Sequence, residues 1–130
     1  LLIMAAAISD FTPTDVADQK IKKKGEGSVS LDLMKVEDFM PLAQGKNLVK
    51  VAFAAETNDL EANAHAKAAP KGAAFVVANN VSEPESGFGT DTNKVTFVDP
   101  DGNADPQPLM SKLDVGHAIL DRALPHLSQN

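Results

Sequence analysis

Lysines and an aspartate in predicted loops are the side chains of this sequence best suited to phosphate chemistry. Lys20 opens a Lys-Ile-Lys-Lys run, and a loop lysine can pair with a phosphate or stabilise charge that grows on a transferred phosphoryl group. Asp10 follows an apolar run, where a carboxylate can hold a divalent cation or a ribose hydroxyl. The residues alone leave two other interpretations open, a solvated charge run for Lys20 and a turn residue for Asp10.

Two further lysines stand four residues apart, and a phenylalanine stands at a predicted strand end. Lys67 and Lys71 would share one face of a continuous helix, but Pro70 predicts that the helix stops near Ala69 and that Lys71 lies just past its end. Cations that complement the dipole of an exposed helix end are the alternative. Phe53 could flank a ligand, and a core position is the equal alternative.

Glycines and histidines add less to the chemistry. The pattern Gly87-Phe88-Gly89 falls short of a GxGxxG fingerprint and does not open a helix, so it predicts a mobile loop. The histidines show no ligand spacing with one another, so we assign them no metal. These are His65, His117 and His126.

Composition excludes several classes of protein. The net charge of −6 argues against nucleic-acid binding, and the absence of cysteine excludes disulfides and suits a reducing cytoplasm. The apolar run Leu1–Ile8 is far shorter than a membrane span and has no basic segment before it, so it predicts a buried strand rather than an anchor or signal peptide. A chain that opens inside a strand is expected to be a piece of a longer domain.

Hydrophobic patterning places strands and helices alternately along the chain. The predicted strands are Leu1–Ile8, Ser28–Val36, Leu48–Ala54, Ala73–Ala78, Lys94–Val98 and Gln107–Met110. The predicted helices are Glu37–Gln44, a second capped by Asn58 and Glu61, and a third that begins at Ser111 and Asp114. The apolar stripe of the third helix is predicted to be Leu113, Leu120, Leu124 and Leu127.

This alternation predicts an α/β fold, a Rossmann-like and mostly parallel sheet with helices on both faces. Ligands bind beyond the carboxyl ends of the strands in such sheets. Asp10, Phe53 and Asn79 each follow a different predicted strand, and Lys67 lies on an intervening helix. We therefore expect these four residues to converge on one cleft.

Several short motifs together resemble one known family, phosphopantothenoylcysteine synthetase, the ligase of coenzyme A biosynthesis that bacteria usually fuse to a flavin-dependent decarboxylase. The motifs are Met4-Ala5-Ala6-Ala7-Ile8-Ser9-Asp10-Phe11, Gln19-Lys20-Ile21-Lys22-Lys23, Ala52-Phe53-Ala54-Ala55-Glu56-Thr57-Asn58, Val77-Ala78-Asn79-Asn80 and Gly87-Phe88-Gly89-Thr90-Asp91-Thr92-Asn93. The resemblance covers Leu1 to about Leu127, which matches the later part of the ligase domain. It implies that residues 1–130 are its C-terminal part, without the upstream glycine- and serine-rich segment.

The resemblance implies roles for individual residues. Lys20 matches the catalytic lysine, and Asp10 matches an aspartate of the nucleotide site, where we assign Mg²⁺ to it. The backbone at Ala6 and Ala7 approaches the base. The other residues that the resemblance or their position assigns to the nucleotide are Phe53, Lys67 and Lys71, and those assigned to the substrate side are Asn79, Gly87, Phe88 and Gly89.

The implied reaction joins 4′-phosphopantothenate and cysteine through an acyl-nucleotide made from CTP, with Mg²⁺ as the metal. FMN is implied only if a decarboxylase is fused upstream. The resemblance also implies a homodimer or higher oligomer in the cytoplasm, without nucleic-acid or membrane partners. This chain alone is expected to be inactive.

The sequence departs from the family pattern at three places. These are Asn80 in place of Asp, Ala52 in place of Gly, and Val36-Glu37-Asp38 in place of Asn-Pro-Asp. Two other functions stay open, a non-catalytic nucleotide-binding regulatory module of the same family and an NAD(P)-dependent oxidoreductase. The missing GxGxxG counts against the oxidoreductase.

Overall fold

The structure is a computed structural model, which describes residues 1–6, 8–22, 28–56, 59–82, 85–86 and 89–128. The chain divides into two compact units. The core unit comprises Leu1–Ala5 and Met40–Asn130, and the hairpin unit comprises Ala6–Phe39. Each unit is described below by itself.

The core unit is built on a five-stranded mixed sheet of order β1-β4-β5-β7-β8. β1 (Leu2–Met4), β4 (Lys50–Glu56) and β5 (Phe75–Asn80) run parallel. β7 (Val95–Val98) and β8 (Ala104–Pro106) join antiparallel to their neighbours. The prediction that β1, β4 and β5 are parallel neighbours is confirmed. The prediction of a mostly parallel sheet is wrong, because β7 pairs antiparallel with β5 and a tight turn brings β8 back antiparallel to β7.

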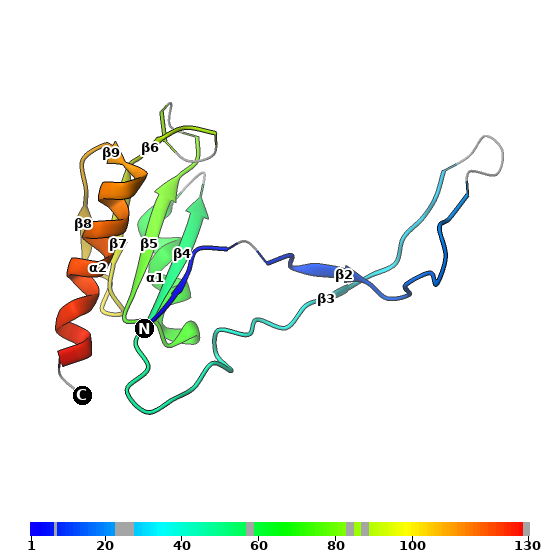
Figure 1. Cartoon of the computed structure of the whole chain (residues 1–130), viewed down its shortest axis with the longest axis horizontal. Coiled ribbons are helices and arrows are strands. Elements are labelled where there is room, and N and C mark those ends of the chain that lie inside the picture. The colour runs from blue at the N-terminus through cyan, green and yellow to red at the C-terminus, as the bar shows by residue number, and fades with distance from the viewer. Residues whose placement is uncertain (7, 23–27, 57–58, 83–84, 87–88, 129–130) are drawn as a thin grey trace. The chain divides into compact units, whose positions relative to one another are not determined.

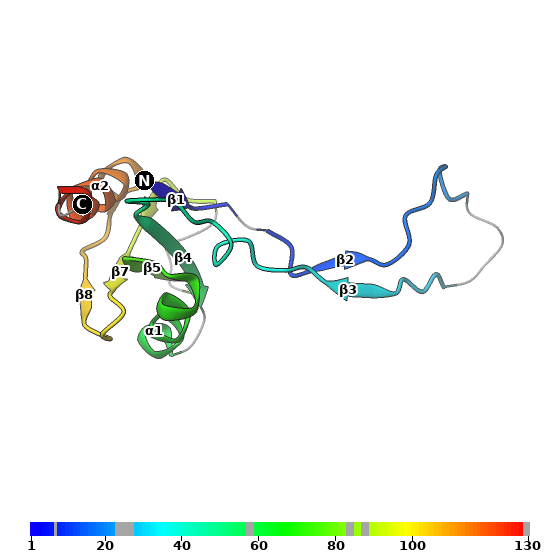
Figure 2. The same ribbon diagram turned by 90° about the horizontal axis from the view of Figure 1, so that it is seen from below.

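One helix covers each face of this sheet, as Figure 2 shows. α1 (Leu60–Lys71) packs on one face and α2 (Lys112–Ser128) on the other. Side chains alternate along each strand, so odd-numbered residues meet α2 in one core cluster. The cluster joins Val51, Phe75, Val77, Val95 and Phe97 of the sheet to Val115, Ile119 and Ala123 of α2. Near-continuous apolar strands are therefore buried on both faces.

The first strand is shorter and more exposed than its sequence predicts. β1 spans three residues, and Ile3 and Ile8 are exposed. Within the described residues β1 is the edge of the sheet and pairs only with β4. The prediction of a buried strand from Leu1 to Ile8 is therefore wrong in extent and burial, because no described strand pairs with the outer edge of β1.

α1 presents small residues to the sheet and continues past its proline. Ala64 and Ala68 are fully buried, and Pro70 is accommodated in the last turn. Gly72 ends the helix at φ 59, where its N–H reaches the carbonyls of Ala68 and Ala69. Lys71 is therefore the last helical residue and lies four residues after Lys67 on the same helix, which corrects the prediction that it lies past the end. The predicted cap Asn58 is outside the described residues, and Asp59 takes the N-cap position.

α2 begins as its sequence predicts but buries a different face. Ser111 Oγ accepts the Asp114 N–H at 3.1 Å and donates to Asp114 Oδ2 at 2.6 Å, a reciprocal cap. The residues that face the sheet are Val115, Ile119 and Ala123. The predicted leucine stripe is exposed instead, at 70% for Leu113, 44% for Leu120, 56% for Leu124 and 36% for Leu127.

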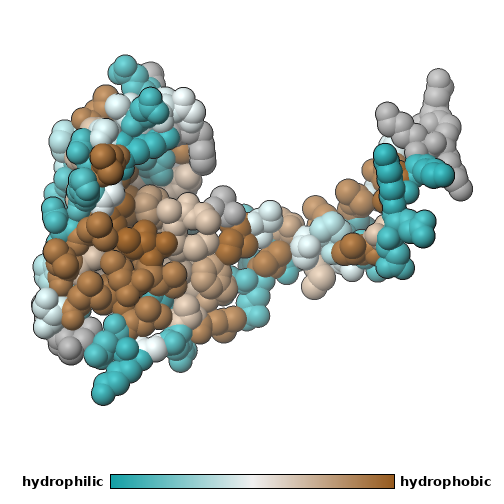
Figure 3. All heavy atoms as spheres, in the orientation of Figure 1, coloured by the Kyte–Doolittle hydropathy of each residue, from teal (hydrophilic) through white to brown (hydrophobic). Residues whose placement is uncertain are grey.

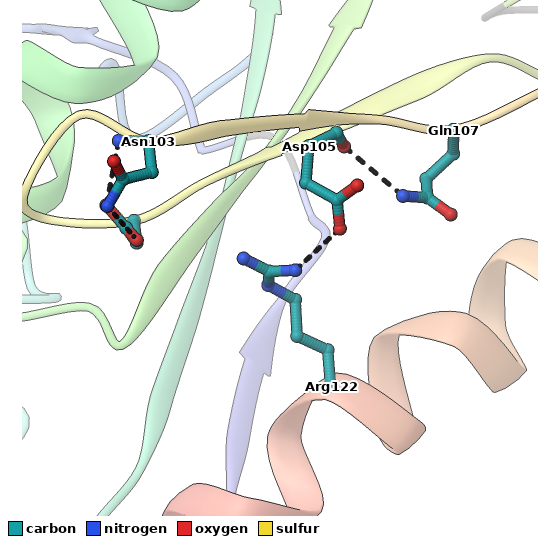
Figure 4. Close-up of polar contacts among 5 residues, drawn as sticks. Asn103, Asp105, Gln107 and Arg122 are labelled. Atoms are coloured by element: carbon teal, nitrogen blue, oxygen red, sulfur yellow. Dashed lines mark hydrogen bonds and ion pairs between the residues drawn. The ribbon is translucent and has the colours of Figure 1, made fainter.

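An arginine of α2 fastens this helix to the sheet. Arg122 donates to Asp105 Oδ2 of β8 at 2.8 Å, as Figure 4 shows. Its guanidinium lies 5.5 Å from the centroid of the Phe75 ring and 5.2 Å from that of Phe97. These two rings meet edge to face at 5.6 Å. The arginine therefore combines an ion pair with two cation–π contacts.

The turn between β7 and β8 is organised by one carboxylate. Asp99 Oδ1 accepts the backbone N–H groups of Asp101 and Asn103, and Oδ2 accepts the Asn103 side-chain amide. Gly102 takes φ 88, a conformation that favours glycine. The hydrogen bond from the Asn103 side chain, helped by those from the two backbone groups, holds the pKa of Asp99 below its usual 3.8.

We expect Asp99→Asn to lower the free energy of unfolding by roughly 0.5–1 kcal/mol at neutral pH, because the charged acceptor is lost. Because the pKa of Asp99 is lower in the folded chain than in the unfolded chain, its carboxylate stabilises the fold at pH values above the unfolded-state pKa. This stabilisation is lost as the pH falls through the folded-state pKa. The difference from the native chain should therefore shrink below about pH 4. Thermal melts at pH 7 and pH 3 measure it, with Asp101→Asn as the control, and an equal difference at both pH values would contradict it.

The hairpin unit is a two-stranded ribbon. β2 (Phe11–Pro13) pairs antiparallel with β3 (Leu33–Lys35), and Thr14 donates to the Asp32 carbonyl through both its N–H and its hydroxyl. β3 is fully exposed, so the half-buried strand predicted for Ser28–Val36 is shorter and does not face a core. The helix predicted for Glu37–Gln44 is wrong, because the chain there forms only a turn at Met40–Leu42.

Two short strands complete the chain. β6 (Thr92–Asn93) pairs antiparallel with β9 (Met110–Ser111). The strand predicted at Gln107–Met110 is therefore replaced by β8 and β9 on either side of Gln107. The predicted strand at Lys94–Val98 is confirmed as β7.

Candidate functional site

Asn79 lies next to the carboxyl end of β5, as predicted. The prediction that Phe53 stands at a strand end is wrong, because β4 continues to Glu56 and Phe53 is its middle residue. Phe53 is opposite Val77, and Ala55 is opposite Asn79, in the register of β4 and β5. Alternation puts Phe53 and Asn79 on the same face of the sheet, on neighbouring strands and two residue pairs apart. Phe53 is half-buried and packs against the core cluster. The core interpretation of Phe53 is therefore confirmed, and its role beside a ligand stays a prediction.

The end of β5 carries two amide side chains. Asn79 is buried at 8% exposure, which is unusual for a polar residue in a strand of valines and alanines. Asn80 accepts the Ser82 N–H at 2.9 Å, so it closes a turn of the chain immediately beyond the strand. These amides make this edge of the sheet polar where ligands of α/β sheets bind.

A polar network that the sequence did not predict ties the following loop to β6. Ser86 is 5% exposed, and its hydroxyl donates to Asn93 Oδ1 at 2.8 Å and accepts the Lys94 N–H at 3.2 Å. The Thr92 hydroxyl donates to the Glu85 carbonyl. Serine and asparagine at a spacing of seven residues carry no sequence signal, because only the fold brings them together. Gly89 lies on this loop at φ 76 and is exposed, whereas Gly87 and Phe88 lie outside the described residues.

The two helical lysines lie elsewhere in the core unit. α1 starts beyond the carboxyl end of β4 and runs back toward the amino end of β5. Lys67 stands about 10 Å along the helix from Leu60, from a rise of about 1.5 Å per residue, and Lys71 ends it. The structure therefore does not bring these lysines close to Phe53 and Asn79, because Phe53 and Asn79 lie on the face of the sheet opposite α1. Their role at a nucleotide stays a prediction.

The remaining candidates belong to the hairpin unit. Asp10 immediately precedes β2, its side chain is exposed, and its carbonyl accepts the Val36 N–H at 2.8 Å. Lys20 and Ala6 are exposed, and Ala7 lies outside the described residues. The convergence of Asp10 with Phe53 and Asn79 stays a prediction, since the two residues belong to the core unit. Asp10 and Lys20 are both exposed, so both side chains are accessible to a charged ligand.

Neither a metal cage nor a membrane span is found in the described part of the chain. No group of three or more histidine or acidic side chains that could hold a metal ion occurs among the described residues. No described helix is long and apolar enough to cross a bilayer.

The sequence model of one protein family matches residues 1–126, and that family is the DNA/pantothenate metabolism flavoprotein C-terminal domain. The chain belongs to this family. The resemblance to phosphopantothenoylcysteine synthetase is thereby confirmed, because the matched region is the synthetase part of the coenzyme A biosynthesis bifunctional protein CoaBC.

Curated relatives of this flavoprotein C-terminal domain are several times longer than the chain. CoaBC of Bacillus subtilis is 43% identical over 122 residues, 92% of this chain and 30% of that protein. CoaBC of Escherichia coli K12 is 33% identical over 127 residues, 93% of this chain and 31% of that protein. A cysteine/cysteine sulfinic acid decarboxylase from an unknown prokaryote is 36% identical over 127 residues, 95% of this chain and 35% of that protein. The chain thus spans about a third of these relatives.

A solved structure agrees with the fold. It is the crystal structure of the C-terminal domain of CoaBC, which matches with a TM-score of 0.70 and 25% identity. The match covers 96% of this chain and 53% of that one. The solved domain therefore contains nearly as much polypeptide again outside the matched region.

Proposed function

We propose that this flavoprotein C-terminal domain carries the nucleotide- and substrate-handling part of a phosphopantothenate–cysteine ligase. The observation that carries the proposal is the match of the family model to 126 of the 130 residues, together with relatives named as coenzyme A biosynthesis bifunctional proteins. The polar carboxyl end of β5 at Asn79 and Asn80 and the exposed Lys20 and Asp10 supply groups suited to the reaction.

The proposed reaction has two steps. The carboxylate of 4′-phosphopantothenate attacks the α-phosphorus of CTP, a new P–O bond forms, and the bond to the departing pyrophosphate breaks. The amine of cysteine then attacks the acyl carbon, the amide forms, CMP leaves and the nitrogen loses a proton. Lys20 would stabilise the negative charge that grows on the phosphoryl oxygens in the first step.

Other residues have binding roles in this proposal. Lys67 and Lys71 would pair with the nucleotide, and the backbone at Ala6 and Ala7 would approach its base. Phe53 lies on the opposite face of the sheet from these lysines, so it would flank only a part of the nucleotide that passes the carboxyl ends of the strands. The segment Gly87-Phe88-Gly89, with Asn79, would cover the substrate side and limit the access of water to the reactive anhydride.

A magnesium ion fits the residues present. Mg²⁺ binds through one or two carboxylates plus substrate phosphates and keeps several waters, so a single exposed carboxylate at Asp10 suits it. When bound it would neutralise part of the triphosphate charge. A homodimer or higher oligomer, as the resemblance implies, belongs to the same proposal.

A chimera tests the function. We would replace the matched segment of the Bacillus subtilis relative with this chain and measure pyrophosphate release with CTP, 4′-phosphopantothenate and Mg²⁺. We expect release that requires 4′-phosphopantothenate, and more release with CTP than with ATP. A folded chimera that binds CTP but releases no pyrophosphate would instead favour the regulatory module.

A further inference from the structure

Helix α2 exposes leucines with the spacing of a helix–helix seam. We call Leu113, Leu120, Leu124 and Leu127 the leucine seam. Together with His117 they follow intervals of four, three, four and three residues, which is the a/d pattern of packed helices. The seam is solvent-exposed in this chain, while the residues that bind α2 to its own sheet lie on another face of the helix.

The sheet edge beside the seam is also uncovered. β1 is a parallel strand, and parallel strands are normally buried on both faces, yet Leu1 is 47% and Ile3 is 36% exposed. Figure 3 shows hydrophobic side chains gathered in one area over α2 and the neighbouring part of the sheet. An apolar area of this kind marks a surface that another element covers.

The length of the related domain indicates what covers it. The solved C-terminal domain of CoaBC matches 96% of this chain, but the chain accounts for only 53% of it. The remainder belongs to the same compact domain in that protein. The 4-3 spacing of the seam favours a helix as its partner, because it is the spacing of helix–helix contacts.

We propose that the leucine seam of α2 packs against an amphipathic helix from the part of a CoaBC ligase domain that lies outside the matched region. Leu120 and Leu124 are the centre of this contact, because they occupy neighbouring positions in the middle of the seam. The inference rests on family membership and on the proposed ligase domain, and not on the catalytic roles.

The test compares one double substitution in two contexts. Leu120→Glu with Leu124→Glu is made in the isolated chain and in the Bacillus subtilis chimera. In the isolated chain Leu120 is already 44% and Leu124 56% exposed, so we expect the midpoint of thermal unfolding to move by less than about 2 °C. In the chimera two charges would enter a packed seam, and we expect a fall of at least about 5 °C.

The matched control is Leu109→Glu. Leu109 is 45% exposed, close to the 44% of Leu120, but lies outside the seam in the loop before β9. It should change neither midpoint by more than about 2 °C. Equal small shifts for seam and control in the chimera would overturn the proposal.

A second measurement covers the case in which the charged chimera does not fold. The chain contains no cysteine, so Leu124→Cys creates one defined thiol, whose labelling is followed by mass spectrometry of its peptide. We expect labelling at least tenfold slower in the chimera than in the isolated chain. Equal rates would overturn the proposal, as would slow labelling in the isolated chain caused by self-association at the seam, which light scattering detects.

Pyrophosphate release separates this proposal from the proposed function. An inactive chimera that keeps the 5 °C difference and the slow labelling would leave the seam intact and refute the ligase. An active chimera without either effect would refute the seam alone.

Discussion

Lys20→Gln in the Bacillus subtilis chimera is expected to lower pyrophosphate release from CTP by about a hundred- to thousandfold. A donor aimed at developing charge contributes roughly 3–4 kcal/mol to the transition state. Glutamine keeps part of the stem and a hydrogen-bond donor but removes the positive charge. Lys20 is exposed in the hairpin unit, so its replacement leaves no cavity and should move the thermal midpoint by less than about 2 °C.

Lys22→Gln is the matched control, because Lys22 is exposed in the same charge run. It should reduce release by less than tenfold, since it contributes only to the general attraction of the phosphates. The assay is the initial rate of pyrophosphate release, with a thermal melt of each variant. Equal effects of the two substitutions on pyrophosphate release would contradict the catalytic role and would favour the interpretation of Lys20 as part of a solvated charge run.

Phe75→Ala in the 130-residue chain is expected to lower the free energy of unfolding by about 3–5 kcal/mol. Phe75 is fully buried in the central strand β5, and its ring meets Phe97 and the Arg122 guanidinium. Truncation therefore removes transfer energy, leaves a cavity between the sheet and α2, and deprives Arg122 of one of its two aromatic partners. A loss of this size is a large part of the 5–15 kcal/mol typical of a whole protein.

Phe11→Ala is the control for this substitution. Phe11 is 58% exposed in β2, so the same chemical change should cost less than about 0.5 kcal/mol. Urea unfolding followed by circular dichroism measures both. Similar losses for the two phenylalanines would show that Phe75 is not in a packed core.

Hydrophobic runs and capping residues by themselves determined the central elements. Leu48–Ala54 and Ala73–Ala78 are near-continuous apolar runs, and burial on both faces demands such runs, so the two central strands are predicted within about two residues. Ser111 and Asp114 predict the start of α2 correctly, because their reciprocal hydrogen bonds join residues that are close in the sequence. The order of the short motifs also predicts the family, and the family model that matches residues 1–126 confirms this prediction.

The tertiary structure decided the features that depend on what lies opposite a residue. Four leucines form the strongest stripe on α2, yet Val115, Ile119 and Ala123 face the sheet. Periodicity gives the direction of an apolar face, but a helix with two apolar faces leaves open which one its own sheet will bury. Only the packing against Phe75 and its neighbours answers this.

The same limit applies to the sheet and to the candidate site. The hairpin that reverses β7 and β8 depends on a four-residue turn held by Asp99, and turn chemistry does not tell which sheet edge the strand returns to. The partnership of Ser86 with Asn93 and the separation of Lys67 from Asn79 arise in the same way. Sequence fixes which residues can do chemistry, whereas distances between them are set by long-range pairing of strands and helices, which no local pattern encodes.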